Sequence, residues 1–352
     1  MRGVVKSFLK EILWSVPRYD RPHAGRPICL YAARRGGSTL LMQVIGANRG
    51  IRYYDEPFSV FSAPYRGLYR NPPLPLRYAS QFTSIHVDEA EEVKAYLAAI
   101  LDGNLTWNNP WKFWDPEYDF VYTRKLLKIL DAKPLIDWID KTFSVDTVYL
   151  ARHPVPVALS VLQRKWDSTS RPYLQDVDFC RRYLTDSLLD FSWRIYMSGD
   201  RFANAILNWC LDNAAPFALI PIRPQWVSVT YEDLVVSPEA VIRTLSEKLD
   251  LKGRERMLRQ IRRPSSSSRS LEIGPRTPAG REALVSGWVS KVTPDMVRTA
   301  DEILERFSIT LYRAGNPMPT GQWSQSVPAR AIGETGAREM TAPINRSVDG
   351  VK

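Results

Sequence analysis

The feature that most constrains the fold is a short apolar segment that leads through a glycine-containing loop into a helix. Residues 27–33 (PICLYAA) are apolar and lie between a proline and two arginines, which is typical of a fully buried strand. The loop Arg34-Arg35-Gly36-Gly37-Ser38-Thr39 follows, and residues 38–47 carry apolar side chains at helical spacing. A buried strand that turns directly into a helix predicts an α/β domain.

The same alternation continues along the chain. Further strands are predicted at 51–54, 120–123, 145–151 and 226–230. Helices are predicted at 89–101, 134–143, 154–163, 176–194, 201–213, 238–249 and 293–307. Short apolar strands between helices favour a three-layer α/β/α architecture with a mainly parallel central sheet.

Composition divides the chain into one large domain and two flanking segments. The main domain is expected at 25–313, with an irregular insertion at 62–118 that is rich in Pro, Tyr, Trp and Arg. Residues 1–24 predict an amphipathic segment packed on the domain, and they leave peripheral membrane contact open. Residues 314–352 contain few large apolar side chains, which predicts a disordered tail.

Apolar runs and cysteines bear on the compartment. No run of 18 apolar residues occurs, so no membrane-spanning helix is expected, and the N-terminus does not resemble a secretory signal. The three cysteines, Cys29, Cys180 and Cys210, are widely spaced, which indicates neither a disulfide framework nor a metal site. We therefore expect a cytoplasmic protein with its cysteines in the core.

The net charge of +10 is concentrated in one segment. Residues 254–281 contain eight arginines and two glutamates, a local excess of +6. Such an excess can attract nucleic acid, an anionic membrane or a multiply charged small ligand. The segment has no aromatic residue that could stack on bases, so a nucleic-acid partner is not expected.

The loop at residues 34–39 has the chemistry of a phosphate site. Its glycines allow close approach of backbone N–H groups, and the following helix offers unpaired N–H groups and the positive end of its dipole. Arg35 adds a planar set of donors, and Ser38 and Thr39 add hydroxyls. An ordinary nucleotide-binding P-loop has a lysine just before its Ser or Thr, and Gly37 stands there instead. A P-loop phosphotransferase is therefore the weaker alternative.

Two further motifs point to a family. Strand 145–151 leads into Arg152-His153-Pro154, with Ser160 eight residues after the arginine. Tyr231-Glu232-Asp233-Leu234 follows the last predicted strand. Together with Arg35-Gly36-Gly37-Ser38-Thr39, these segments resemble the sulfotransferases that use 3′-phosphoadenosine 5′-phosphosulfate (PAPS), with Gly36 in place of the usual serine. The resemblance covers residues 27–250 and is closer to the carbohydrate, tyrosylprotein and bacterial branches than to the cytosolic branch.

The resemblance implies roles for individual residues. Arg34, Arg35, Gly36, Gly37, Ser38 and Thr39 would hold the 5′-phosphosulfate, and Arg152 and Ser160 would hold the 3′-phosphate. Arg35 would also stabilise the leaving oxygen. Glu56, in Asp55-Glu56-Pro57, would be the general base, with Asp55 and His86 as competitors. The product would be adenosine 3′,5′-bisphosphate (PAP), and no metal is expected.

Three more basic residues remain candidates for the site. In relatives, a basic residue near the strand at 120–123 reaches the active site; Arg124 and Lys125 both follow it here, and the choice between them stays open. Arg269 and the serines at 265–268 could contact the cofactor phosphates. The acceptor would be a hydroxyl of a saccharide, lipid or other small molecule. The alternative is a non-catalytic protein that binds a nucleotide sulfate or a sulfated glycan.

Overall fold

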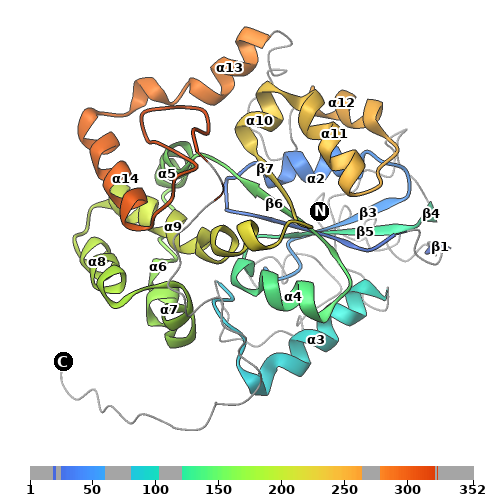
Figure 1. Cartoon of the computed structure of the whole chain (residues 1–352), viewed down its shortest axis with the longest axis horizontal. Helices are drawn as coiled ribbons and strands as arrows, with labels where there is room; N and C mark the ends of the chain where they lie inside the picture. The colour runs from blue at the N-terminus through green and yellow to red at the C-terminus, as the bar shows by residue number, and fades with distance from the viewer. Residues whose placement is uncertain are drawn as a thin grey trace, which may run out of the picture.

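Five parallel strands form the centre of the molecule (Figure 1). The computed structural model describes residues 19–20, 25–59, 81–102, 121–263, 278–321 and 323. The strand order is β3-β5-β2-β6-β7, and every neighbouring pair is parallel. The strands are β2 (Ile28–Ala32), β3 (Ile51–Asp55), β5 (Arg124–Ile129), β6 (Asp146–Ala151) and β7 (Val227–Thr230). A separate parallel pair joins β1 (Tyr19–Asp20) to β4 (Val121–Tyr122).

Helices connect and surround these strands. The longer ones are α2 (Ser38–Gly46), α3 (Val87–Leu101), α5 (Pro154–Gln163), α8 (Asp186–Met197), α9 (Arg201–Leu219), α11 (Pro238–Lys248), α12 (Arg254–Ile261), α13 (Pro278–Ser286) and α14 (Pro294–Arg306). The shorter ones are η3 (Lys133–Leu135), α4 (Ile136–Thr142), α6 (Ser170–Gln175), α7 (Val177–Tyr183) and α10 (Tyr231–Val236).

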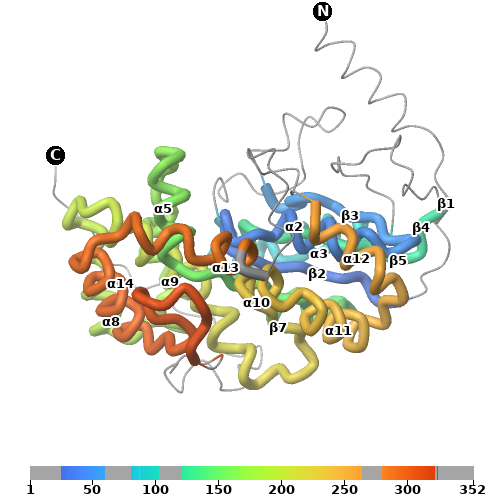
Figure 2. The backbone as a smooth tube through the Cα atoms, turned by 90° about the horizontal axis from the view of Figure 1, so that it is seen from above, coloured from blue at the N-terminus to red at the C-terminus, as the bar shows by residue number. Residues whose placement is uncertain are grey.

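The helices cover both faces of the sheet, because alternate side chains of each buried strand point to opposite faces. One face carries Ile28, Leu30 and Val148 and packs against α2, α11 and α12. The other face carries Tyr31 and Tyr149 and packs against α3, α4 and α9. The expected three-layer α/β/α fold with a parallel sheet is confirmed. Figure 2 shows that α5, α8, α9 and α14 extend the molecule beyond one end of the sheet.

Three predicted elements differ from the structure. The strand expected at 120–123 is the short β4, and a six-residue central strand, β5, begins at Arg124. The helix expected at 176–194 is two helices, because Thr185 accepts a hydrogen bond from Leu188 N and starts α8 anew. The helix expected to end at residue 213 continues to Leu219 with Pro216 inside it.

Helix α9 is the central helix of the extension beyond the sheet. The stretch Arg201–Ile222 is long and apolar enough to span a membrane by length and composition, yet 72% of its most apolar window is buried inside the protein. It packs against α5, α8 and α14. These contacts make it a core helix of this fold.

The C-terminal boundary of the folded part lies beyond residue 313. Ala314 is fully buried, and the Trp323 ring lies 5.9 Å from the Tyr149 ring and 5.5 Å from the Phe217 ring, centroid to centroid. The expectation of a disordered tail from residue 314 is therefore wrong for residues 314–321 and 323. The rest of that tail, nearly all of segment 1–24 and most of the insertion at 62–118 lie outside the described residues.

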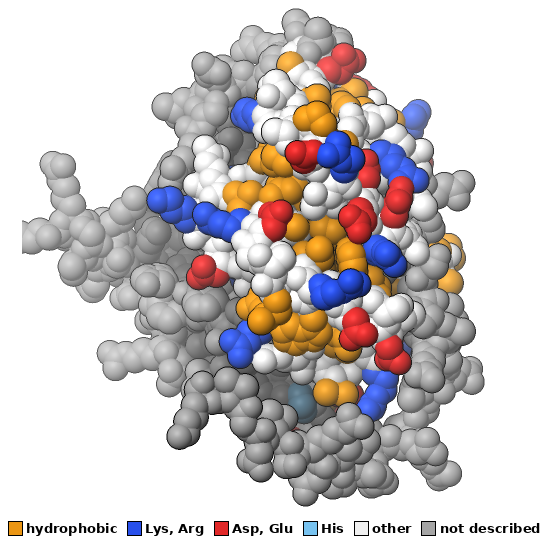
Figure 3. Space-filling model, turned by 90° about the vertical axis from the view of Figure 1, so that its left-hand side faces the viewer, with side chains coloured by type: hydrophobic (Ala, Val, Ile, Leu, Met, Phe, Trp, Pro, Cys, Tyr) orange, Lys and Arg blue, Asp and Glu red, His pale blue; other side chains and the backbone are white. Residues whose placement is uncertain are grey.

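The surface charge is mixed on the face that includes α8 and α14. Basic and acidic side chains alternate there with apolar ones (Figure 3). Of the basic segment 254–281, α12 is described, and Arg254 and Arg281 reach Glu247 and Glu239 at 3.2 and 3.8 Å. All three cysteines are free and buried, as expected for core residues.

Candidate active site

The candidate residues gather at the carboxyl ends of the central strands. The phosphate loop follows β2, Glu56 follows β3, Lys128 lies near the end of β5, and Arg152 follows β6. Strand β2 lies between β5 and β6. After β2 the chain first forms β3 and β5 on one side of it, and later forms β6 and β7 on the other side. Parallel α/β sheets bind ligands in the crevice at such a switch point.

The loop after β2 has a backbone that requires glycine. Gly37 has φ +88°, and a Cβ atom built there would lie 2.3 Å from the Tyr231 ring. A Cβ atom on Gly36 would lie 2.8 Å from the carbonyl oxygen of Ala33, which accepts a hydrogen bond from Gly36 N. The serine usual in the resembled motif therefore does not fit this backbone. Arg35 itself has φ +64°, a left-handed conformation that costs a non-glycine residue about 1 to 3 kcal/mol.

Helix α2 presents an open amino end to this loop. It begins at Ser38, its N-cap is Gly37, no side chain caps it, and its first turn carries no acidic residue. Backbone N–H groups at a helix amino end, together with the helix dipole, attract an anion. The arrangement fits a phosphate or another anion.

The second predicted phosphate site meets the first. Arg35 Nε donates to Ser160 Oγ at 3.0 Å, although the residues are 125 positions apart. Arg152 Nη1 donates to the carbonyl oxygen of Arg35 at 2.9 Å, and its guanidinium lies 4.1 Å from the centroid of the Tyr231 ring. The buried Nε of Arg152 has no partner among the described residues. The four residues therefore form one basic cluster at the carboxyl ends of β2 and β6.

Glu56 lies on the other side of the loop and is held by a buried lysine. Lys128 Nζ lies 3.0 Å from Glu56 Oε1, contacts Asp55 Oδ1 and reaches Thr39 Oγ1 at 3.3 Å. Burial alone would lower the pKa of Lys128, but the charges of Asp55 and Glu56 more than offset it and raise that pKa. Lys128 is therefore a fixed cation between the carboxylates and the loop. Glu56 has φ +55°, a second strained non-glycine residue.

Arg34 binds Asp131, a buried carboxylate just after β5. Its Nε and Nη2 donate to Asp131 Oδ1 at 3.1 and 2.9 Å, and Gln81 Nε2 lies 3.3 Å from the same oxygen. Burial raises the pKa of Asp131, and the nearby charge of Glu56 adds to that rise while Arg34 and Lys133 oppose it. Ser38 is buried at the start of α2.

The structure corrects the expected placement of Arg124 and Lys125. Both lie at the first two positions of β5, the opposite end of the sheet from the loop. Arg124 is tied to Asp146 and to the carbonyl oxygens of Arg26 and Leu249, and Lys125 Nζ donates to Leu101 O at 2.6 Å. The basic residue that reaches the site from this region is Lys128, which sequence reasoning missed. The sequence does carry a signal for this residue, because Lys128 is a single charge inside the apolar run from Leu126 to Leu130.

His86 falls outside the cluster. His86 is exposed at the start of α3. Arg269 and the serines at 265–268 lie outside the described residues.

His153 and Glu232, which belong to the two other motifs, have structural contacts. His153 N donates to Glu232 Oε1 at 3.0 Å, and Tyr312 Oη lies 2.9 Å from Glu232 Oε2. His153 Nε2 lies 3.1 Å from Arg313 O, and its Nδ1 accepts from Val155 N at 3.2 Å. Burial lowers the pKa of His153 to about 4. The two motifs thus join β6 to the C-terminal part of the fold.

Comparison with known proteins gives matches by structure. No family model matches the sequence, and no curated protein matches it significantly. A sulfotransferase domain from the curacin biosynthetic pathway matches over 81% of this chain and 98% of its own, with 17% identity and a TM-score of 0.42. A mouse sulfotransferase complexed with PAP matches over 84% of this chain and 89% of its own, with 14% identity and a TM-score of 0.36. The sulfotransferase domain of a Synechococcus olefin synthase matches over 81% of this chain and 98% of its own, with 19% identity and a TM-score of 0.34.

These three structures are sulfotransferases. At such identities and TM-scores the likeness concerns the fold, and it assigns no residue or activity to this chain.

Proposed function

We propose that this chain is a sulfotransferase that transfers a sulfuryl group from PAPS to a hydroxyl of a saccharide, lipid or other small acceptor. The observation that carries the proposal is the contact between the two phosphate motifs. Arg35 and Ser160, 125 residues apart, meet at 3.0 Å beside Arg152 and the open amino end of α2. Two adjoining anion sites suit a nucleotide with phosphates at both its 5′ and 3′ positions.

The donor supplies an activated sulfuryl group, and the residues present supply the rest. The α2 amino end and Arg35 would hold the 5′-phosphosulfate, and the positive charge of Arg35 would stabilise the leaving oxygen. Ser160 Oγ accepts from Arg35, so its own proton remains available to a 3′-phosphate oxygen, with Arg152 beside it. Glu56 would take the proton of the acceptor hydroxyl, and Lys128 fixes the position of its carboxylate.

Calorimetric titration with PAP and with ATP tests the donor assignment. Wild-type protein should bind PAP more tightly than ATP, because the 3′-phosphate meets Arg152 and Ser160. Arg152→Ala should weaken PAP at least about tenfold and leave adenosine 5′-phosphosulfate, which lacks the 3′-phosphate, nearly unchanged. Preference for ATP would instead support a phosphotransferase, and equal losses for both ligands would contradict the Arg152 assignment.

Single-turnover transfer from labelled PAPS tests the base. Glu56→Gln should keep PAP affinity and lose transfer by about 10² to 10⁴-fold. Asp55→Asn is the matched control, because Asp55 contacts the same lysine. The reverse ranking of the two variants would make Asp55 the base. PAP binding without transfer to any acceptor tried would favour a non-catalytic binding protein. The cytoplasmic location stays a prediction.

A further inference from the structure

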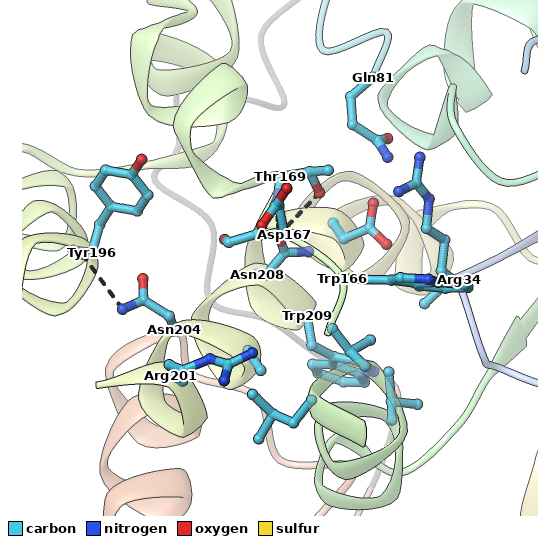
Figure 4. Close-up of a pocket in the computed structure, with 17 residues that line it drawn as sticks. Arg34, Gln81, Trp166, Asp167, Thr169, Tyr196, Arg201, Asn204, Asn208 and Trp209 are labelled. Carbon is cyan, nitrogen blue, oxygen red and sulfur yellow. Dashed lines mark hydrogen bonds between the residues drawn. The ribbon is translucent and has the colours of Figure 1, made fainter. Parts of the chain in front are cut away.

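A cavity of about 290 Å³ lies beside the phosphate loop, on the side of Arg34. Residues of α5, α8 and α9 and of the segment 166–169 line it (Figure 4). Its volume is just below the range of about 300 to 1,000 Å³ that is usual for small-molecule sites. The cavity is therefore large enough for one compact organic molecule.

The inner end of the cavity borders the proposed reaction centre. Arg34 and Gln81 line this end, and both bind Asp131, whose pKa responds to the charge of Glu56. Val157 and Val161 line it from α5, the helix that carries Ser160. A hydroxyl at this end would lie next to the loop that is proposed to hold the sulfuryl group.

Part of the cavity wall is apolar. Its apolar residues include Val157, Val161 and Leu162 of α5, Ala205 and Trp209 of α9, and Trp166. Trp209 is nearly fully buried, and its Nε1 donates to the backbone oxygen of Arg152 at 3.1 Å. This hydrogen bond holds the Trp209 wall of the cavity to the basic cluster. Burial of a flat hydrocarbon body against an indole ring is favourable, because it removes apolar surface from water.

Asn208, near the centre of the view in Figure 4, and Arg201, on the side away from Arg34, offer further hydrogen-bond donors. Asn208 Oδ1 already accepts from Thr169 N and Thr169 Oγ1, so its Nδ2 is the group that remains for a ligand. Arg201 lines the cavity with an exposed guanidinium, together with the exposed Asp167. Figure 4 shows Arg34, Gln81 and Trp166 on one side of the view and Tyr196, Asn204 and Arg201 on the other.

We propose that this cavity binds the acceptor, and that the acceptor is a compact, mainly apolar alcohol with an oxygen acceptor group opposite its reacting hydroxyl. A carbonyl or carboxylate oxygen would meet Asn208 Nδ2 and Arg201. A saccharide fits less well, because each of its hydroxyls needs a partner, and the side chains of α5 and Trp209 that line the cavity offer only aliphatic carbon and an indole ring. The inference rests on the proposed sulfotransferase function and narrows its acceptor to one class.

The first experiment compares three acceptors with PAPS as donor. 6-Hydroxy-2-naphthoate carries the distal carboxylate, 2-naphthol lacks it, and N-acetylglucosamine represents saccharides. The expected order of kcat/KM is hydroxynaphthoate above 2-naphthol by about tenfold, with N-acetylglucosamine lowest. Equal values for the two naphthols, or the highest value for the sugar, would overturn the acceptor class. Failure of the PAP-bound protein to bind either naphthol would overturn it as well.

The second experiment alters the cavity without touching the nucleotide cluster. Ala205→Trp should fill part of the cavity and raise KM for both naphthols at least about tenfold, with PAP affinity unchanged. Met197→Trp is the matched control, because Met197 is 75% exposed on α8 and does not line the cavity. Leu162→Trp fills the cavity from the α5 side. It replaces Ala205→Trp if that variant melts at a lower temperature than wild type. Unchanged KM in a folded filling variant would place the acceptor elsewhere.

The third experiment isolates the distal hydrogen bond. Asn208→Asp keeps an oxygen that accepts from Thr169 and replaces the free Nδ2 donor by a carboxylate oxygen. It should lower kcat/KM for hydroxynaphthoate about tenfold or more and change that for 2-naphthol less than about twofold. Equal losses for both would overturn the role of Asn208. Failure of the wild type to bind PAP is a separate outcome, because it would refute the proposed function itself.

Discussion

The two ends of strand β5 carry basic residues in opposite situations. Arg124 and Lys125, at the amino end, are fully engaged by Asp146 and by backbone oxygens. Lys128, near the carboxyl end, contacts Asp55, Glu56 and Thr39, the last residue of the phosphate loop. One six-residue strand thus contributes both to the packing of the fold and to the site. The role of each basic side chain depends on where it lies along the strand, and not on its charge.

Of the changes that test this comparison, Lys128→Met should have the largest effect. Loss of the cation would leave Asp55 and Glu56 as neighbouring carboxylates near the transferred group. Transfer from labelled PAPS should fall by about 10³-fold. PAP affinity by calorimetry should change far less, because the α2 amino end and Arg152 remain. Near-normal turnover in this variant would mean that Lys128 is a structural residue like Arg124 and Lys125. The proposed difference between the two ends of β5 would then be wrong.

Arg124→Met should change stability instead of chemistry. Asp146 would keep Arg26, 2.8 Å away, but lose its buried partner, and the carbonyl oxygens of Arg26 and Leu249 would lose a donor. We expect a loss of about 3 to 4 kcal/mol in the free energy of unfolding by urea denaturation. The PAP dissociation constant of the folded variant should match wild type. A selective loss of PAP binding would contradict the division between the two ends of β5.

The third prediction concerns His153, a structural residue that lies just after the carboxyl end of β6. Its pKa is about 4 in the folded protein, below the usual 6.5. The unfolded chain therefore binds the proton more tightly, so stability is full above about pH 6.5 and is lost as the pH falls toward 4. This loss should reach about 3 kcal/mol near pH 4.

His153→Asn offers the matched comparison, because an amide oxygen can still accept from Val155 N but does not titrate. The difference in unfolding free energy between the two proteins, measured by urea denaturation from pH 7 to 4.5, should shrink as the pH falls. A constant difference would mean that His153 does not carry this pH dependence.

Sequence reasoning located the fold and the loop because those depend on local signals. The apolar run at 27–33 and the glycines at 36 and 37 are adjacent in the chain, and their structure follows from neighbouring residues. The Arg152 and Ser160 positions came from a resemblance, and the structure brings both to Arg35.

The errors arose where distant residues decide the outcome. The sequence predicts a strand that stops at Thr123, whereas β5 begins at Arg124. Asp146 and Leu101, far along the chain, supply the partners that allow burial. That early stop also hid Lys128. The packed residues after 313 escaped for the same reason, since Trp323 is held by Tyr149 and Phe217.

The left-handed backbone of Arg35 and Glu56 has a consequence for engineering. Both positions favour glycine conformationally, so replacing either residue by glycine would relieve backbone strain while removing its side-chain function. Selection of this protein for heat resistance alone would therefore tend to erode the two residues proposed to perform transfer. A library screened for melting temperature and a library screened for turnover should diverge first at positions 35 and 56.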